Sequence, residues 1–144
     1  MDETLQSAYF YKTKSPDLQP LVVSFHTWSA TYTQCDSINE FSFEKGYNYI
    51  HPNFRGLNNT KDACCSEMVT SDIDASIDFA IENANVDTTR IYVIGMNGGG
   101  YATLAMFMKS KHKIKKFSSW VPLVDLIQWH EKTKILKLEH APEI

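Results

Sequence analysis

The chain has 144 residues, a length typical of a single domain. Hydrophobic residues make up 43% of it, charged residues make up 22%, and the formal net charge is −3. This composition is that of an ordinary globular protein; it does not favour nucleic acid or an anionic membrane as a partner, and no apolar run is long enough to predict a membrane span.

The predicted elements alternate between strand and helix along most of the chain. In chain order we expect strand 6–12, strand 21–25, helix 35–46, strand 47–54, helix 70–85, strand 90–96, helix 99–110 and strand 116–126. This order predicts an α/β fold with a mostly parallel sheet and helices on both faces. Ligands of such sheets bind beyond the carboxyl ends of the strands, so we expect the site in the loops after Phe25, Phe54, Met96 and Trp120.

The clearest helix is the one predicted over residues 70–85. Ile73, Ile77 and Ile81 recur at a spacing of four residues and predict one apolar face. Thr70 or Ser71 is expected to cap its start, because a hydroxyl can accept a hydrogen bond from the first free N–H groups.

The cysteines and histidines do not have the spacing of a metal site. Cys35, Cys64 and Cys65 form no C-x-x-C pair, so we expect buried or half-buried free thiols. The histidines show neither H-x-x-x-H nor H-E-x-x-H spacing. We therefore expect no metal and no cofactor.

Residues 91–107, IYVIGMNGGGYATLAMF, join an apolar strand to a helix through a glycine cluster. This is the form of a nucleophile elbow, a strained turn with the motif G-x-S-x-G. Gly95 and Gly99 take the glycine positions, and Asn97 stands at the serine position. Asparagine tolerates a positive φ, but its amide is not a usable nucleophile. The alternative is a simple glycine-rich or phosphate-binding turn, although the segment lacks the G-x-G-x-x-G order and the P-loop lysine.

The pair Asn97–Gly98 also has a chemistry of its own, since the Gly98 nitrogen can attack the asparagine side chain. In a rigid elbow we expect the geometry for this attack to be poor and the pair to be durable.

Four segments together resemble the catalytic domain of the prolyl-oligopeptidase-like (S9-type) α/β-hydrolases, especially their esterases related to acetyl-xylan esterases. They are PLVVSFHTWSATY (20–32), NYIHPNFRG (48–56), SEMVTSDIDASIDFAIENANVDTTRIYVIGMNGGGYATL (66–104) and SSWVPLVDLIQWH (118–130). The resemblance implies a partial α/β-hydrolase fold, with residues 1–144 as one truncated domain. It also implies hydrolysis of acyl esters or peptides as the activity of the family.

The resemblance assigns a role to several residues. The family's elbow is G-x-S-G-G-G, so Asn97 falls on the nucleophile and Gly98 on one oxyanion donor. The backbone N–H of Thr27 or Trp28 is implied as the second donor. Implied substrate-binding residues are His26, Arg55, Trp120 and Asp125.

Each of these side chains also has a structural alternative. His26 can be a structural residue at a strand end, and Arg55 can form an internal ion pair. Trp28, Trp120 and Trp129 can form an apolar wall of the site or simply fill the core.

The rest of the family's catalytic triad does not match. In the family the acid and then the histidine follow later strands. Asp125, His130 and His140 follow Asn97, but Asp125 stands too early for the acid. We therefore expect a chain that lacks its nucleophile, acid and base and is catalytically inactive. It would be an altered piece of an active enzyme, a natural pseudo-enzyme that acts as a binding or interaction module, or an enzyme of other chemistry.

The expected partner is a small-molecule ester, an acylated sugar or a peptide, with no nucleic acid and no membrane. The start has no apolar segment typical of a signal peptide, so a cytoplasmic location is the default expectation. The strand predicted over residues 116–126 would lie on an exposed sheet edge and favour a homo-oligomer, unless residues 131–137 fold back over it.

Overall fold

The structure is a computed structural model, and it describes residues 4–58, 60 and 62–137. The strands are β1 (Ala8–Tyr11), β2 (Gln19–Phe25), β3 (Asn48–Pro52), β4 (Val86–Met96) and β5 (Lys116–Trp120). The helices are α1 (Ser37–Lys45), α2 (Glu67–Asn83), α3 (Gly98–Lys109) and α4 (Leu126–Ile135).

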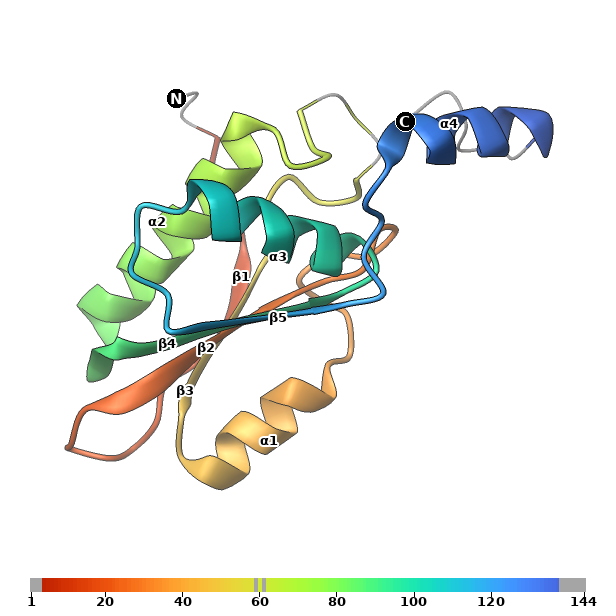
Figure 1. The fold of residues 1–144 in the computed structure, drawn as a ribbon. Coiled ribbons are helices and arrows are strands. Elements are labelled where there is room, and N and C mark those ends of the chain that lie inside the picture. Colours follow the sequence, from red (N-terminus) through yellow and green to blue (C-terminus); the bar gives the residue numbers. More distant parts are fainter. Residues whose placement is uncertain (1–3, 59, 61, 138–144) are drawn as a thin grey trace.

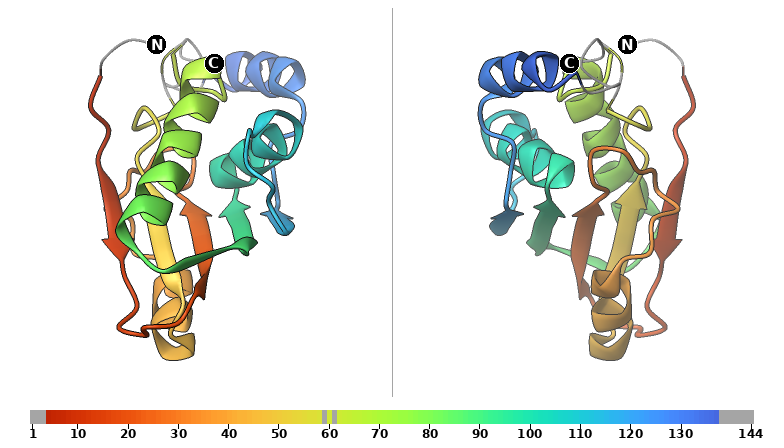
Figure 2. Two further views of the ribbon diagram at one scale, coloured as in Figure 1. Left: turned by 90° about the vertical axis from the view of Figure 1, so that its left-hand side faces the viewer. Right: turned by 90° about the vertical axis from the view of Figure 1, so that its right-hand side faces the viewer.

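The described strands form one sheet in the order β1-β3-β2-β4-β5. Strands β3, β2, β4 and β5 run parallel, whereas β1 runs antiparallel to β3, as the arrows in Figure 2 show. The predicted mostly parallel sheet is therefore confirmed, as is the position of the first strand at an edge. The antiparallel direction of β1 was not predicted.

Helices cover both faces of the sheet, as expected. Figure 1 shows α1 on one face and α2 with α3 on the other. Helix α4 lies beyond the carboxyl ends of the parallel strands, away from both faces (Figures 1 and 2). Among the described residues, no helix is long and apolar enough to cross a membrane.

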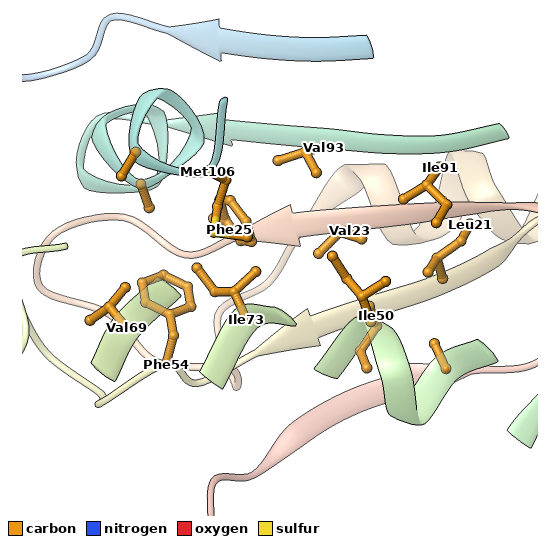
Figure 3. Close-up of a cluster of buried hydrophobic side chains, with 14 of the residues drawn as sticks. Leu21, Val23, Phe25, Ile50, Phe54, Val69, Ile73, Ile91, Val93 and Met106 are labelled. Carbon is orange, nitrogen blue, oxygen red and sulfur yellow. The ribbon is translucent and has the colours of Figure 1, made fainter. Parts of the chain in front are cut away.

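The main core lies between the sheet and the layer of α2 and α3. Branched side chains from the three central strands point toward these helices (Figure 3). Its fully buried members include Leu21, Val23, Ile50, Phe54, Val69, Ile73, Ile77 and Met106. Both predicted patterns are found here: the continuous apolar strand packs against the apolar face of α2, whose isoleucines are four residues apart.

Helix α2 begins earlier than the sequence predicted. Ser66 is its N-cap, and the Ser66 hydroxyl accepts a hydrogen bond from Val69 N–H at 3.3 Å. The predicted caps Thr70 and Ser71 lie inside the helix. Several hydroxyl residues stood close to the true start, so spacing alone could not select the cap that the fold uses.

Strand β5 is shorter than predicted. It ends at Trp120, because Val121 has a φ of 39° and Pro122 has no N–H to continue the sheet. Residues 121–125 form a loop instead of the second half of a strand. The three cysteines are free thiols; Cys65 is buried and Cys64 half-buried, as expected, whereas Cys35 is exposed.

Candidate functional site: a strand-to-helix elbow with asparagine at its tip

Asn97 occupies the tip of a sharp turn between β4 and α3. It is the N-cap of α3 and is exposed, with a φ of 57° and a ψ of −117°. Few residues other than glycine adopt a positive φ, and asparagine is one of them. The Asn97 N–H donates to the Trp120 carbonyl at 3.0 Å, which ties the turn to the end of β5.

The glycines around Asn97 are required by close approach of the backbone. A Cβ on Gly98 would lie 2.6 Å from Trp28 Cα. A Cβ on Gly95 would collide with the Gly99 carbonyl group and would lie 2.8 Å from the Thr103 hydroxyl. The loop after β2 can therefore rest directly on the first turn of α3, and the glycine cluster has a packing reason.

The backbone donors named in the sequence differ in what they bind. The Gly98 N–H donates to the Oδ1 atom of Asn97 itself at 2.7 Å. The Thr27 N–H donates to Gln34 Oε1 at 2.8 Å. For the Trp28 N–H, no acceptor is found among the described residues. The Thr27 and Gly98 N–H groups are therefore engaged within the protein, and the role of Trp28 as an oxyanion donor stays a prediction.

His26 holds the loop after β2 in place through contacts of its buried ring. Its ring is fully buried, Nδ1 lies 2.9 Å from the Thr27 carbonyl, and Nε2 lies 2.9 Å from the Asn53 carbonyl. The ring stacks on Phe54 at 4.0 Å between centroids. Burial lowers the pKa of His26, and the two carbonyl contacts oppose this shift. These contacts match the structural alternative, and a role in substrate binding stays a prediction.

A cavity of about 500 Å³ opens in front of the elbow. It is lined by Thr27, Trp28, Ser29, Met96, Asn97, Val121, Leu123 and Trp129. Three of the four loops expected to form the site, those after β2, β4 and β5, meet here. The fourth loop, after β3, does not line the cavity but contacts a residue that does, because the Asn58 N–H donates to the Trp28 carbonyl at 3.0 Å.

Arg55 is engaged inside the protein. Its Nε lies 2.7 Å from Asp72 Oδ2, and its Nη2 lies 3.2 Å from Asp72 Oδ1, so the two side chains form a bidentate pair. Both side chains are largely buried. Of the two alternatives left open by the sequence, the internal ion pair is present, and substrate binding by Arg55 stays a prediction.

Trp120 and Asp125 do not line the cavity at the elbow. Trp120 lines a different cavity of about 270 Å³ near the start of α1, and its indole N–H donates to the Ser118 hydroxyl at 2.8 Å. The Asp125 carboxylate caps α4 by accepting from the Gln128 N–H at 2.9 Å. A substrate-binding role for either residue stays a prediction.

No Asp–His pair of the triad type is recorded downstream of the elbow in the part of the chain that the structure describes. His130 does not line the cavity that Asn97 lines, and His140 lies outside the described residues. Within the same part of the chain, no group of three or more His, Cys, Asp or Glu side chains could hold a metal ion.

Two residues that shape the site were missed from the sequence. The Gln34 side chain accepts a hydrogen bond from the Thr27 N–H. Asn58 donates to the Trp28 carbonyl from both its backbone N–H and its side-chain amide. Both lie in irregular loops, where no periodic pattern marks a residue as important. A side-chain amide that holds a loop is recognised only once the loop is seen in the folded structure.

The sequence and the fold are similar to those of known proteins. The Prolyl oligopeptidase family model matches residues 33–143. Among solved structures, acetyl xylan esterase from Paenibacillus sp. R4 superposes with a TM-score of 0.66 at 17% identity, over 94% of this chain and 50% of that one. Pyrococcus horikoshii acylaminoacyl peptidase superposes with a TM-score of 0.62 at 20% identity, over 74% of this chain and 19% of that one.

A Mycobacterium tuberculosis puromycin-hydrolyzing peptidase is similar in the same way, with a TM-score of 0.65 at 19% identity, over 88% of this chain and 22% of that one. The chain thus spans half or less of these three proteins. No curated protein matches the sequence. The match of the family model over most of the chain, on an α/β-hydrolase sheet, shows that the chain belongs to the prolyl oligopeptidase family of serine hydrolase-type esterases and peptidases.

Proposed function

We propose that the chain binds the acyl group of an ester, an acylated sugar or a peptide at its elbow and does not hydrolyse it by serine chemistry. The observation that carries this proposal is the strained elbow at Asn97 with the backbone N–H groups of Gly98 and Trp28 beside it. In this family such a turn presents the nucleophile, and the donors stabilise the acyl oxygen.

The Trp28 N–H is the stronger candidate for the second donor. It lies against Gly98, and no described residue accepts from it, whereas Gln34 occupies the Thr27 N–H. An acyl oxygen must displace the Asn97 side chain from the Gly98 N–H, because that side chain already accepts its hydrogen bond. We therefore expect weak binding with contacts to both Gly98 and Trp28.

Hydrolysis is not expected, because Asn97 offers no nucleophile. A carboxamide nitrogen cannot be activated by a neighbouring base as a hydroxyl can. In an unrelated serine hydrolase, loss of the nucleophile costs on the order of 10⁶ in kcat.

A second candidate function is that of an interaction module. It is favoured by the apolar side chains exposed near β5 and α4, which include Trp120, Val121, Val124 and Ile127 at 60% to 76% exposure. Such a group of large apolar side chains is typical of a surface that meets another protein. This role is compatible with a binding site at the elbow.

The test is an amide NMR titration with an acetylated xylo-oligosaccharide and with the same sugar after deacetylation. We expect the Gly98 and Trp28 resonances to move with the acetylated sugar alone, and no acetate to be released. The variant Asn97→Gly frees the Gly98 N–H and should bind about fivefold more tightly, because one competing hydrogen bond is lost.

Shifts that are equal for the two sugars would contradict acyl recognition, and so would the absence of shifts with either sugar. Release of acetate by the unaltered protein would contradict the loss of catalysis. Glu82→Gln, at an exposed position of α2 outside the cavity lining, serves as the control and should leave the titration unchanged.

A further inference from the structure

The Asn97–Gly98 pair has the backbone geometry of a closed five-membered ring. Asn97 has a ψ of −117°, and on an L residue this angle brings Cβ nearly into eclipse with the Gly98 nitrogen about the Cα–C bond. The Gly98 nitrogen also lies 2.7 Å from Asn97 Oδ1, so the carboxamide is folded back toward that nitrogen. Ring closure between the two groups needs no rotation about ψ.

The Gly98 N–H is available for this chemistry. Gly98 is the first residue of α3, and the first N–H groups of a helix have no acceptor within the helix. Its recorded partner is the Asn97 side chain, so ring closure disrupts no helical hydrogen bond. The N-terminal end of the helix dipole also favours the negative charge that develops during attack.

The surroundings leave room for a leaving group and for water. Asn97 is exposed and lines the cavity of about 500 Å³. Its amide nitrogen makes no recorded hydrogen bond with the described residues. Gly98 has no side chain that could block the approach, and this is the only Asn-Gly pair in the sequence.

We propose that Asn97–Gly98 is a self-modification site at which the folded chain converts Asn97 to aspartate or isoaspartate. The Gly98 nitrogen attacks Asn97 Cγ and forms a new N–C bond. The Cγ–Nδ2 bond breaks, and Nδ2 leaves as ammonia after taking the proton of the Gly98 amide. Water then opens the succinimide, at Cγ to give aspartate or at the main-chain carbonyl to give isoaspartate.

This inference reverses the expectation that a rigid elbow protects the pair. Rigidity protects an asparagine only when it holds the reacting groups apart, and here it holds ψ near the value of the product ring and the carboxamide close to the Gly98 nitrogen. The aspartate product carries a carboxylate at the position of the family's nucleophile, and carboxylates are among the side chains that form covalent intermediates. The proposal goes beyond acyl binding and does not depend on it.

The test compares the folded protein with the same chain unfolded in guanidinium, at one mildly alkaline pH and one temperature. Trypsin releases residues 91–109, which contain Asn97 as their only asparagine. Mass spectrometry follows the loss of one ammonia in the succinimide and the replacement of NH₂ by OH in the products. We expect the folded protein to react at least about tenfold faster, because its reacting groups are already oriented.

A folded protein that reacts at the same rate as the unfolded chain, or more slowly, would overturn the proposal. The control is Asn97→Gln, whose longer side chain would have to close a six-membered ring. We expect no product from this variant, and product formation at the unaltered rate would equally count against the mechanism. None of these readouts involves a ligand, so they are independent of the outcome of the acyl-binding titration.

Discussion

Asn97 carries a carboxamide where serine has a hydroxyl. The carboxamide is too weak a nucleophile to attack an ester, but it is long enough to reach the N–H of Gly98. Its carboxamide oxygen accepts from the Gly98 N–H, the donor that an acyl oxygen would need. The residue at the tip of the elbow therefore competes with a ligand for the site. This competition follows from the positive φ and the ψ of Asn97, which direct the side chain back over the helix terminus.

Replacing the tip residue tests whether the missing nucleophile is the only defect. We predict that Asn97→Ser restores little ester hydrolysis, leaving turnover within about tenfold of the unaltered protein. A serine needs a base within hydrogen-bond reach, and no histidine is found among the residues that line the cavity. Turnover of p-nitrophenyl acetate measures this, and a gain of several orders of magnitude would mean that a histidine is recruited.

At the scale of the element, the start of α2 depends on one hydroxyl. We predict that Ser66→Ala lowers the free energy of unfolding by about 1 kcal/mol, because the Val69 N–H loses its acceptor. Ser66→Asp keeps an acceptor at the same position and serves as the control. Urea unfolding of the three proteins gives the comparison, and equal stability of Ser66→Ala and the unaltered chain would contradict the cap.

The carboxyl ends of β2 and β3 make folding sensitive to acid. Burial lowers the pKa of His51, opposed by the charge of Asp36 at 3.7 Å and reinforced by His26. Burial also lowers the pKa of His26. The ordinary pKa of both histidines is 6.5, so on acidification the unfolded chain takes up protons at these sites at a higher pH than the folded chain does.

We therefore predict that the free energy of unfolding decreases as the pH falls from about 7.5 to about 5.5. Well above the unfolded pKa of 6.5, both histidines are neutral in both states and contribute nothing to this slope. The variant His51→Gln should show a smaller decrease, because one of the two buried rings no longer titrates. Urea midpoints across this range measure the effect; stability that is constant or rises on acidification would contradict it.

The alternation of strands and helices could be predicted because it follows from local periodicity. The continuous apolar run of β2 and the four-residue spacing in α2 both reflect one-sided burial. The end of β5 could not be predicted in this way. It depends on Val121, whose positive φ is unusual for a β-branched residue and is imposed by the fold.

The candidate site could be located from the sequence but not completed. The glycine cluster and Asn97 marked the elbow, since such turns need particular residues. The sequence could not show that the Thr27 N–H donates to Gln34, or that Arg55 forms an ion pair with Asp72. Such contacts join loops that are far apart in the sequence, so no regular spacing of residues predicts them.

At the scale of the whole molecule, β5 lies at the end of the described sheet opposite β1. Residues 131–137 do not fold back over it; most of them belong to α4, which lies away from β5 (Figure 1). Large apolar side chains beside this edge are exposed. An open edge with exposed apolar neighbours is a template for pairing with another chain.

We predict that the protein associates as its concentration rises, through the β5 edge. The double variant Trp120→Lys with Val121→Lys, at the exposed end of β5, should remain monomeric to higher concentration, because two charges oppose the contact. Leu18→Lys, at an exposed position before β2, is the matched control and should behave as the unaltered protein. Light scattering across a wide concentration range decides, and a monomer at every concentration would contradict the prediction.

The central claim is that this member of a serine hydrolase-type family has an elbow without a serine nucleophile. The most direct measurement is intact-mass analysis after incubation with a fluorophosphonate, which labels activated serines covalently. We predict no adduct on the unaltered protein. A stoichiometric adduct on any serine, with loss of ester hydrolysis in parallel, would contradict the claim.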